Sequence, residues 1–491
     1  MIMPITTNTT IATCSQIQVG DIERQPTATA PRRSGRVRRA QTGADYRVRM
    51  FRRVPKHLLA SMLALGAVGG LGSVAAAGPT PSALRAAAAA PVGGINIGGL
   101  GFGSRTAEAD QAIEGARRLH AKVVRMELPW AALEPRAANQ IDPQALAYVD
   151  RLVADAAAAG IKVIATVRAS PCWASSAPRK VLSRCSPTTL TTANAWPPRK
   201  PADYAAVVAY LARRYGTKLA AIEVWNEPDQ SNELYFAGPN KPQRYAAVLR
   251  AAYPAIKQAN PNVPVLAGSL VGSNGSFLRA LYAAGIKGFY DGLAVHYYNL
   301  TLGSVRSIRQ VQLANGDEKP LWLDEFGWTS CWPRERVQQE QPCVTEKLQG
   351  QNIANIFRSL AHTSYIAAEV IYQLRDERTE DFGVLRTNAT HKPAFSSLAS
   401  VLAAPFGSVS PVTLQLRSRR GQVLAAGTSP VGDFMQLEAF QGSVLRYRAL
   451  FTLDRFNHYS LALPRVLGSH GLTVRVFQYW AGVGRAAQKR I

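Results

Sequence analysis

Short apolar runs alternate with longer amphipathic stretches through the middle of the chain. The runs are rich in Val, Ile, Leu and Ala, which is typical of strands buried on both faces. Eight are present, at residues 92–98, 121–127, 161–167, 219–225, 263–269, 291–298, 319–325 and 367–374. Between them apolar residues recur every three or four positions, as in helices that pack one face on a sheet. The clearest such stretches are 106–120, 143–159, 202–215, 243–259 and 347–362.

Eight strand–helix units in one segment predict an α/β fold of the closed parallel (β/α)8 TIM-barrel type rather than an open sheet. We assign residues 91–404 to this barrel. Residues 407–491 are different, because short alternating runs separated by Gly, Ser and Asn predict a small C-terminal β-sandwich. This accessory domain either binds sugar or packs on another part of the protein, and packing is the simpler interpretation. A composition that is 47% hydrophobic and 18% charged excludes a disordered or fibrous chain.

The first ninety residues have the composition of a targeting region. Residues 1–49 are polar and Arg-rich without hydrophobic periodicity, and we expect a disordered basic extension. Residues 50–90 combine a basic start, an apolar stretch and small residues that suit cleavage, which predicts a signal peptide with a linker and hence a secreted protein. A retained membrane anchor is the alternative, weakened by its many Gly and Ala residues. Met50 is a better start for a signal peptide than Met1.

The cysteines fit export as well. Of the five, Cys14 precedes the signal-like segment, and the other four form two pairs that are close in sequence. Cys172 and Cys185 lie in one loop-like stretch, and Cys331 and Cys343 lie in another. We predict two local disulfides in an oxidising compartment, with free buried thiols as the alternative. The spacing does not indicate a zinc site.

The positive charge does not identify a nucleic-acid-binding protein. The net charge is +25 and the isoelectric point is about 10.2. Residues 1–57 contribute +8 and residues 407–491 another +8, which leaves +9 spread over the 349 residues between them. Because no nucleic-acid-reading motif accompanies this charge, we expect no nucleic-acid partner.

Two glutamates occupy equivalent places at the ends of apolar runs. Glu227 in "VWNEPD" follows the fourth run, and Glu325 in "LWLDEFGW" ends the seventh. Reactive groups of barrels collect at the carboxyl ends of the strands, so the two carboxylates should converge despite 98 residues of separation. Such a pair can supply acid/base and nucleophilic chemistry. Glu223 and Asp324 lie close by but fit less well, and Glu223 could pair with an arginine on a strand face.

Several motifs resemble the clan A retaining glycoside hydrolases. They are "VWNEPD", "HYY" at 296–298 and "LDEFGW", and they occur in the family's order. The stretches "YFAGPNKPQRYAAVLRAAYPAIKQANPNVPVLAG" and "FGVLRTNATHKPAF" are most similar to family 39 and to the cellulase-like family 5. The resemblance covers residues 92–403. It implies an enzyme that cleaves O-glycosidic bonds of a β-linked oligo- or polysaccharide by double displacement, without a metal or an organic cofactor.

The resemblance also implies roles for individual residues. Glu227 corresponds to the acid/base and Glu325 to the nucleophile, with their carboxyl groups ~5–5.5 Å apart as retention requires. Asn226 corresponds to the residue that hydrogen-bonds the sugar 2-hydroxyl. His296 and Tyr298 line the same mouth, and Tyr298 orients the nucleophile. For His296, a satisfied core histidine is the alternative.

Other residues have a functional and a structural interpretation. Arg125, expected at the end of the second strand, either keeps Glu325 ionised or only bridges neighbouring strands. Trp173 and Trp328 follow strand ends, where an indole can stack on a sugar, although both could be core aromatics; the same holds for Trp130. Many clan members carry a tryptophan at the end of the eighth strand. Here "VIYQLRD" places a tyrosine and a glutamine there, which leaves the sugar unidentified.

Two other functions fit the same residues. A carbohydrate-binding protein could keep the barrel without catalysis, although the presence of both carboxylates favours an enzyme. A transglycosylase would use the same residues and transfer the glycosyl group to a sugar instead of water. A membrane is a partner only if the signal-like segment is retained, and the sequence does not indicate an oligomeric state.

Overall fold

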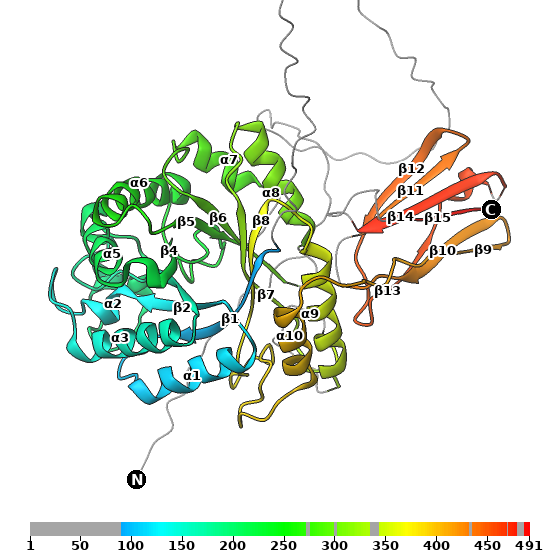
Figure 1. Ribbon diagram of the computed structural model, residues 1–491. Helices are drawn as coiled ribbons and strands as arrows, with labels where there is room; N and C mark the ends of the chain where they lie inside the picture. Colours follow the sequence, from blue (N-terminus) through cyan, green and yellow to red (C-terminus); the bar gives the residue numbers. More distant parts are fainter. Residues whose placement is uncertain are drawn as a thin grey trace, which may run out of the picture. The chain divides into compact units, whose positions relative to one another are not determined.

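The computed structural model describes residues 90–271, 275–298, 302–333, 343–431, 435–468, 470–478 and 486–491 (Figure 1). The expected basic extension, the signal peptide or anchor and Cys14 lie outside these residues. Within the described ranges, no helix is both long enough and apolar enough to cross a membrane.

Eight parallel strands close into a barrel in sequence order, with β1 hydrogen-bonded to β8 (Figure 1). The strands are β1 Val92–Gly99, β2 Val123–Pro129, β3 Lys162–Arg168, β4 Leu219–Val224, β5 Val265–Leu270, β6 Gly292–Tyr298, β7 Leu321–Gly327 and β8 Ile366–Ile371. Each lies within or overlaps one of the eight predicted runs. The sequence-based prediction of a (β/α)8 barrel is therefore confirmed.

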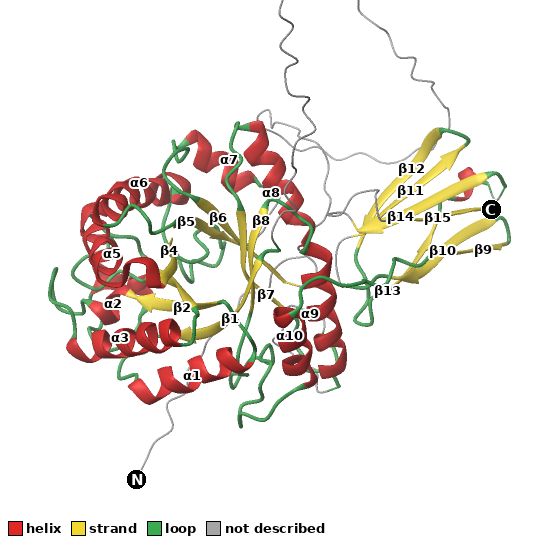
Figure 2. Cartoon of the chain, in the orientation of Figure 1, coloured by secondary structure: helices red, strands yellow, loops and turns green. Residues whose placement is uncertain are grey.

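The helices lie outside the barrel strands (Figure 2). The longer ones are α1 Thr106–Arg118, α3 Pro143–Ala158, α5 Pro201–Tyr215, α6 Lys241–Ala259, α7 Ser276–Ala283, α8 Leu302–Ala314, α9 Glu346–Leu360 and α10 Pro393–Ala403. Their starts follow from capping chemistry. Asp142 accepts hydrogen bonds from two backbone N–H groups of α3, and Pro143 occupies the first turn, where no N–H donor is needed.

The barrel interior changes from apolar to charged toward the carboxyl ends of the strands. An apolar layer is formed by Val123, Ile164, Ala221, Leu266, Ala294 and Val370, with Trp322 packed against it. Side chains two positions apart on a strand share a face. The next layer is therefore made of the residues two positions farther along five of these strands, namely Arg125, Thr166, Glu223, His296 and Asp324. All five are buried, and this polar layer underlies the candidate site.

The C-terminal residues form two antiparallel sheets, as predicted. One has the order β13-β10-β9 and the other β12-β11-β14-β15. Their bounds are β9 Gln415–Arg419, β10 Gln422–Thr428, β11 Met435–Gln441, β12 Val444–Phe451, β13 His458–Ala462, β14 Leu472–Gln478 and β15 Ala487–Arg490. Alternate residues such as Val423, Leu437 and Val474 share one apolar core. This arrangement is a small β-sandwich.

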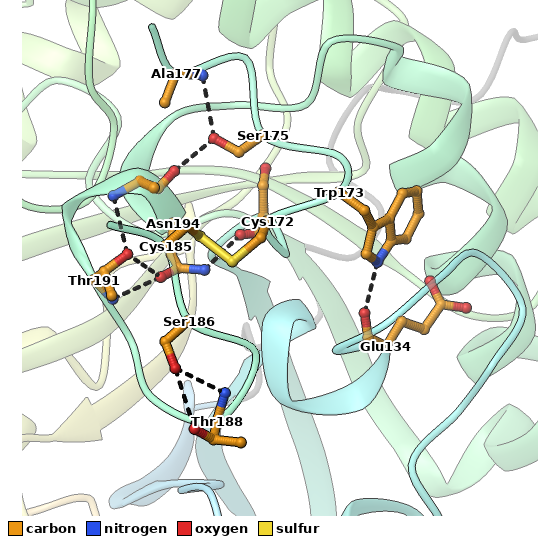
Figure 3. The surroundings of a disulfide bond; sticks show 12 residues. Glu134, Cys172, Trp173, Ser175, Ala177, Cys185, Ser186, Thr188, Thr191 and Asn194 are labelled. Carbon is orange, nitrogen blue, oxygen red and sulfur yellow. Dashed lines mark hydrogen bonds between the residues drawn. A yellow bond between two sulfur atoms is a disulfide. The ribbon is translucent and has the colours of Figure 1, made fainter. Parts of the chain in front are cut away.

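Both predicted cysteine pairs are bonded. Cys172–Cys185 has a Cα–Cα distance of 5.7 Å, and Cys331–Cys343 has one of 5.0 Å. These values lie in the usual range for disulfides. The first bond follows β3 (Figure 3) and the second follows β7, so the first cysteine of each pair lies just beyond the carboxyl end of a strand.

Candidate active site

Glu227 lies in a tight loop directly after β4. Trp225 and Glu227 both have positive φ angles, 73° and 45°, which are uncommon for residues with a side chain. The fully buried Trp225 is held by its indole N–H, which donates to the Tyr235 carbonyl at 2.7 Å. A turn follows, in which the Gln230 N–H donates to the Glu227 carbonyl at 3.2 Å with Pro228 at the second position. The packing of Trp225 and the turn after Glu227 together fix the position of the Glu227 side chain beyond the end of β4.

Glu325 lies within β7, and three donors converge on its carboxylate. Oε1 accepts from Arg125 Nη1 at 2.5 Å and from Asn96 Nδ2 at 3.3 Å. Oε2 accepts from the Tyr298 hydroxyl at 2.6 Å. These three donors orient the carboxylate and lie against both of its oxygens.

His296 lies between the two glutamates. Its Nδ1 is 2.8 Å from Glu227 Oε1 and 3.2 Å from Glu325 Oε2. One oxygen of each carboxylate and a ring nitrogen of His296 all lie within 4.8 Å of one another. Burial disfavours the imidazolium, but the charge of Glu325 and the hydrogen bond with Glu227 outweigh it and raise the pKa of His296 to about 9. A positively charged ring therefore bridges the two carboxyl groups.

The two glutamates differ in their surroundings. Burial raises the pKa of Glu227; the hydrogen bond from His296 opposes this rise, and the nearby charges of Glu325 and Glu127 add to it. Glu325 instead has Arg125 at 2.5 Å. Two carboxyl groups in such different surroundings can take different roles in catalysis, one as an acid/base and the other as a nucleophile.

Arg125 does not lie at the end of its strand as predicted but at the third of seven positions in β2. Its long side chain still reaches Glu325, and it also donates to Glu223 through Nε at 3.0 Å and Nη2 at 3.1 Å. Burial alone would lower the pKa of Arg125, but Glu223, Glu325 and Asp324 together raise it well above its usual value. Arg125 therefore does both things that the sequence left open: it bridges strands, here β2 and β4, and it pairs with Glu325.

Asn226 is oriented by the same arginine. Arg125 Nη2 donates to Asn226 Oδ1 at 2.7 Å. This contact occupies the acceptor end of the amide and leaves its Nδ2 group as the donor end. The side chain is 1% exposed, so this orientation is imposed by buried surroundings.

Glu223 and Asp324 belong to the polar layer beneath the two glutamates. Glu223 accepts from Arg125 and, at 3.0 Å, from the Thr166 hydroxyl, which agrees with its interpretation as the partner of an arginine. Burial and the charge of Glu223 raise the pKa of Asp324 well above its usual value. Glu223 and Asp324 contact Arg125, and Asp324 also lies near His296. Each lies two positions after a residue of the apolar layer on the same strand, and this sequence pattern could have identified them.

The tryptophans give different outcomes. Trp328 is 2% exposed and packs edge-on against Phe326, with 6.4 Å between ring centroids. No face of this indole is open to a sugar, so the prediction of stacking by Trp328 is wrong and the core interpretation holds. Trp130 is fully buried and donates to Glu134 Oε2 at 2.7 Å. Trp173 is only partly buried, donates to the Glu134 carbonyl at 2.8 Å and stays a candidate for sugar stacking (Figure 3).

The end of β8 carries a tyrosine beside the site. Tyr372 contacts Tyr298 edge-on at 6.0 Å between ring centroids, and its hydroxyl donates to Glu380 at 3.0 Å. Gln373, the next residue, is 3% exposed. An aromatic ring is therefore present at the expected strand end, but its polar edge is bound to a carboxylate.

Two groups of side chains have the composition of a metal site. They are Glu227, His296 and Glu325, and Glu223, His296 and Asp324. In the first group the donors already bond to one another and to the hydroxyl and guanidinium groups described above. A divalent cation would lie beside the charges of Arg125 and His296, which disfavours it. The arrangement therefore favours proton transfer and charge stabilisation over metal binding.

A comparison with protein-family models places the chain in a family of glycosidases. The family model described as Cellulase (glycosyl hydrolase family 5) matches residues 87–340, a segment that contains both glutamates. A comparison with curated protein sequences finds no match.

Solved structures with a similar fold include three enzymes. A family 39 glycoside hydrolase from the gut symbiont Bacteroides cellulosilyticus WH2 is 17% identical, with a TM-score of 0.47 over 76% of this chain and 81% of that one. The GH39 enzyme from Xanthomonas axonopodis pv. citri is 14% identical, with a TM-score of 0.48 over 83% and 96%. A GH30 endoxylanase from Clostridium papyrosolvens C71 is 15% identical, with a TM-score of 0.46 over 80% and 97%.

Proposed function

The chain belongs to the cellulase family of clan A glycoside hydrolases, glycosyl hydrolase family 5, and from this premise we propose that it cleaves a β-linked oligo- or polysaccharide with retention of anomeric configuration. As a member of this family it is a glycosidase that acts on carbohydrate. The proposal concerns its mechanism, with Glu325 as the nucleophile and Glu227 as the acid/base.

The spacing of the two carboxylates is the main support for this mechanism. Oxygens of Glu227 and Glu325 lie within 4.8 Å of each other. Retaining glycosidases hold their carboxyl groups ~5–5.5 Å apart, whereas inverting enzymes need ~6.5–9.5 Å to admit a water molecule between the carboxylate and the sugar. The short separation favours direct attack on the sugar by one of the two carboxylates.

In the first step, Glu325 attacks the anomeric carbon and forms a covalent ester. The bond to the leaving oxygen breaks, and that oxygen takes the proton from Glu227. In the second step, the ionised Glu227 removes a proton from water, the water oxygen bonds to the anomeric carbon, and the ester breaks to restore Glu325. Arg125 and Tyr298 stabilise the carboxylate of Glu325 before the first step and after the second.

The positive charge on His296 suits both halves of this cycle. Before the first step the ionised group is Glu325, and in the intermediate it is Glu227. His296 Nδ1 lies within 3.2 Å of an oxygen of each. The imidazolium therefore always has one ionised carboxylate beside it, so the negative charge can move between the glutamates without losing its counter-charge.

Asn226 adds a contact with the substrate to the proposed mechanism. The amide nitrogen of Asn226 is free of Arg125 and can donate to the sugar 2-hydroxyl, a bond that strengthens in the transition state.

The two disulfides also support export of the barrel to an oxidising compartment.

Chemical rescue on aryl β-glycosides with activated leaving groups tests the two assignments. Glu325→Ala should lose turnover, and azide should then attack from the vacated side and release an α-glycosyl azide. Glu227→Ala should form the intermediate and stall, and azide should return a β-glycosyl azide. Glu114→Ala, at an exposed residue of α1, is the matched control and should match wild type.

Two results would contradict the mechanism. Alanine variants of Glu227 and Glu325 that remain as active as wild type would remove the catalytic assignment. A wild-type protein that binds glycans but turns over no member of a broad panel would favour the carbohydrate-binding alternative.

A further inference from the structure

The second carboxylate oxygen of Glu227 has a partner outside the group described so far. Oε1 faces His296, while Oε2 accepts a hydrogen bond from the side-chain amide of Gln230. If Glu227 is the acid/base, this carboxyl group must alternate between a protonated and an ionised form within every turnover. Its neighbour at Oε2 must therefore accommodate both an O–H donor and an oxygen acceptor.

Gln230 is held in place at its backbone. Its N–H closes the turn onto the Glu227 carbonyl at 3.2 Å, and its own carbonyl accepts from Lys241 Nζ at 2.5 Å. The amide of the side chain is thus fixed three residues from the carboxyl group. Among the residues that the structure describes, its Oε1 is buried and has no hydrogen-bond partner.

An amide group is suited to a neighbour that gains and loses a proton. Nε2 is a donor and Oε1 is an acceptor at nearly the same distance from the chain, and a half-turn about the last side-chain torsion exchanges them. That torsion has a broad, roughly two-fold profile, so the exchange meets little resistance. The unpartnered Oε1 is the atom that a half-turn would bring to Glu227.

We propose that Gln230 is a positioning residue whose amide follows the proton on Glu227, donating from Nε2 to the carboxylate and accepting at Oε1 from the carboxylic acid. The inference rests on the proposed role of Glu227. His296 cannot change from donor to acceptor in this way, because a protonated imidazole offers only a donor to Glu227 Oε1. A lysine or arginine at position 230 would likewise offer only donors, together with a full charge that favours the ionised form.

Removal of the amide should shift the titration of Glu227 in one direction. A hydrogen bond to an ionised carboxylate is stronger than one from a neutral acid, so Gln230 stabilises the ionised form more. In Gln230→Met the proton should be held to higher pH. The basic limb of the kcat/KM profile, which reports loss of the acid's proton, should move up by roughly half to one pH unit.

The other titratable groups around Glu227 are unchanged by this substitution. They are His296 and Tyr298 from β6, Glu325 from β7, Glu127 from β2, Glu380 from the loop after β8, and Asp229 and Tyr235 from the loop of Glu227 itself. A shift of the basic limb can therefore be attributed to the amide.

The experiment compares pH profiles of kcat/KM on a β-glycoside with a poor leaving group, which needs acid assistance. Gln230→Met should show the upward shift, and Gln230→Glu should show a larger one, because a second carboxyl group adds like charge beside Glu227. Gln140→Met, at an exposed position, is the matched control and should keep the wild-type profile. Circular dichroism checks that each variant is folded.

The outcomes separate this inference from the proposed function. Folded Gln230→Met and Gln230→Glu enzymes with the wild-type basic limb, beside a Glu227→Ala enzyme that has lost activity, would overturn the role of Gln230 alone. A Glu227→Ala enzyme with wild-type activity and an unchanged profile would overturn the assignment of Glu227, and the inference with it.

Discussion

Replacement of Arg125 by methionine should destabilise the barrel more than any exposed ion pair could. The side chain is fully buried and contacts three acidic residues, with 3.0 Å to Glu223, 2.5 Å to Glu325 and 3.2 Å to Asp324. Methionine follows the arginine side chain only as far as the position of Nε, so it keeps the packing of the aliphatic part and removes the charged guanidinium group. Glu223 would remain buried without the guanidinium that pairs with it, and Glu325 would keep only His296 as a counter-charge.

The expected magnitude follows from this burial. Loss of one partner from a buried ion pair costs ~3–5 kcal/mol, because the remaining charge is desolvated and uncompensated. Against a total stability of about 5–15 kcal/mol for a typical domain, this is a large fraction. The double variant Arg125→Met/Glu223→Gln removes one of the stranded charges and should recover about 1–3 kcal/mol.

Urea unfolding followed by tryptophan fluorescence measures the effect, with the disulfides kept oxidised. Seven of the eight tryptophans lie before residue 404, so the signal reports mainly on the barrel. The control is Arg151→Met, whose ion pairs with Asp110 and Asp155 lie at the surface and should contribute far less to stability than a buried pair. The reasoning is refuted if Arg125→Met is no less stable than this control, or if the second substitution recovers nothing.

Three further outcomes can be measured on the same protein. Tyr298→Phe removes the hydroxyl that donates to Glu325 at 2.6 Å, and kcat/KM should fall about 10- to 100-fold, the equivalent of one charge-assisted hydrogen bond; an unchanged kcat/KM would remove its orienting role. The pKa of His296 is raised to about 9, above the unfolded value of about 6.5, so its contribution to stability should be complete below pH 6.5 and lost as the pH rises through 9. The unfolding free energy gap between wild type and His296→Gln should therefore narrow over that range, and a constant gap would contradict the charged state. Thiol labelling of the unreduced protein should find no reactive thiol in the Cys172–Cys185 and Cys331–Cys343 pairs, whereas four reactive thiols would show that the pairs are open.

The sequence alone was sufficient for the features that depend on local pattern. Eight apolar runs separated by amphipathic stretches permit few arrangements other than a closed barrel, since each run must be buried on both faces. Glu227 and Glu325 could be assigned to the same edge of the barrel because parallel strands have their carboxyl ends together, although Glu325 lies at the fifth of seven positions in β7 rather than at its end. The cysteine pairs were recognisable from their proximity in sequence and their loop-like surroundings.

Tertiary structure decided which side chains meet inside the barrel. Because side chains alternate along a strand, the sequence can assign a residue to one face of the sheet. It does not show how far a long charged side chain reaches, or which strand lies across the barrel from it. Arg125 was expected at a strand end, yet it lies at the third position of β2, in the polar layer, and its long side chain still reaches Glu325. Trp328 follows a strand end as a sugar-stacking residue would, but packing against Phe326 buries it. Gln230 carries no sequence pattern at all, because its contact with Glu227 depends on a turn and on a lysine that begins the next helix.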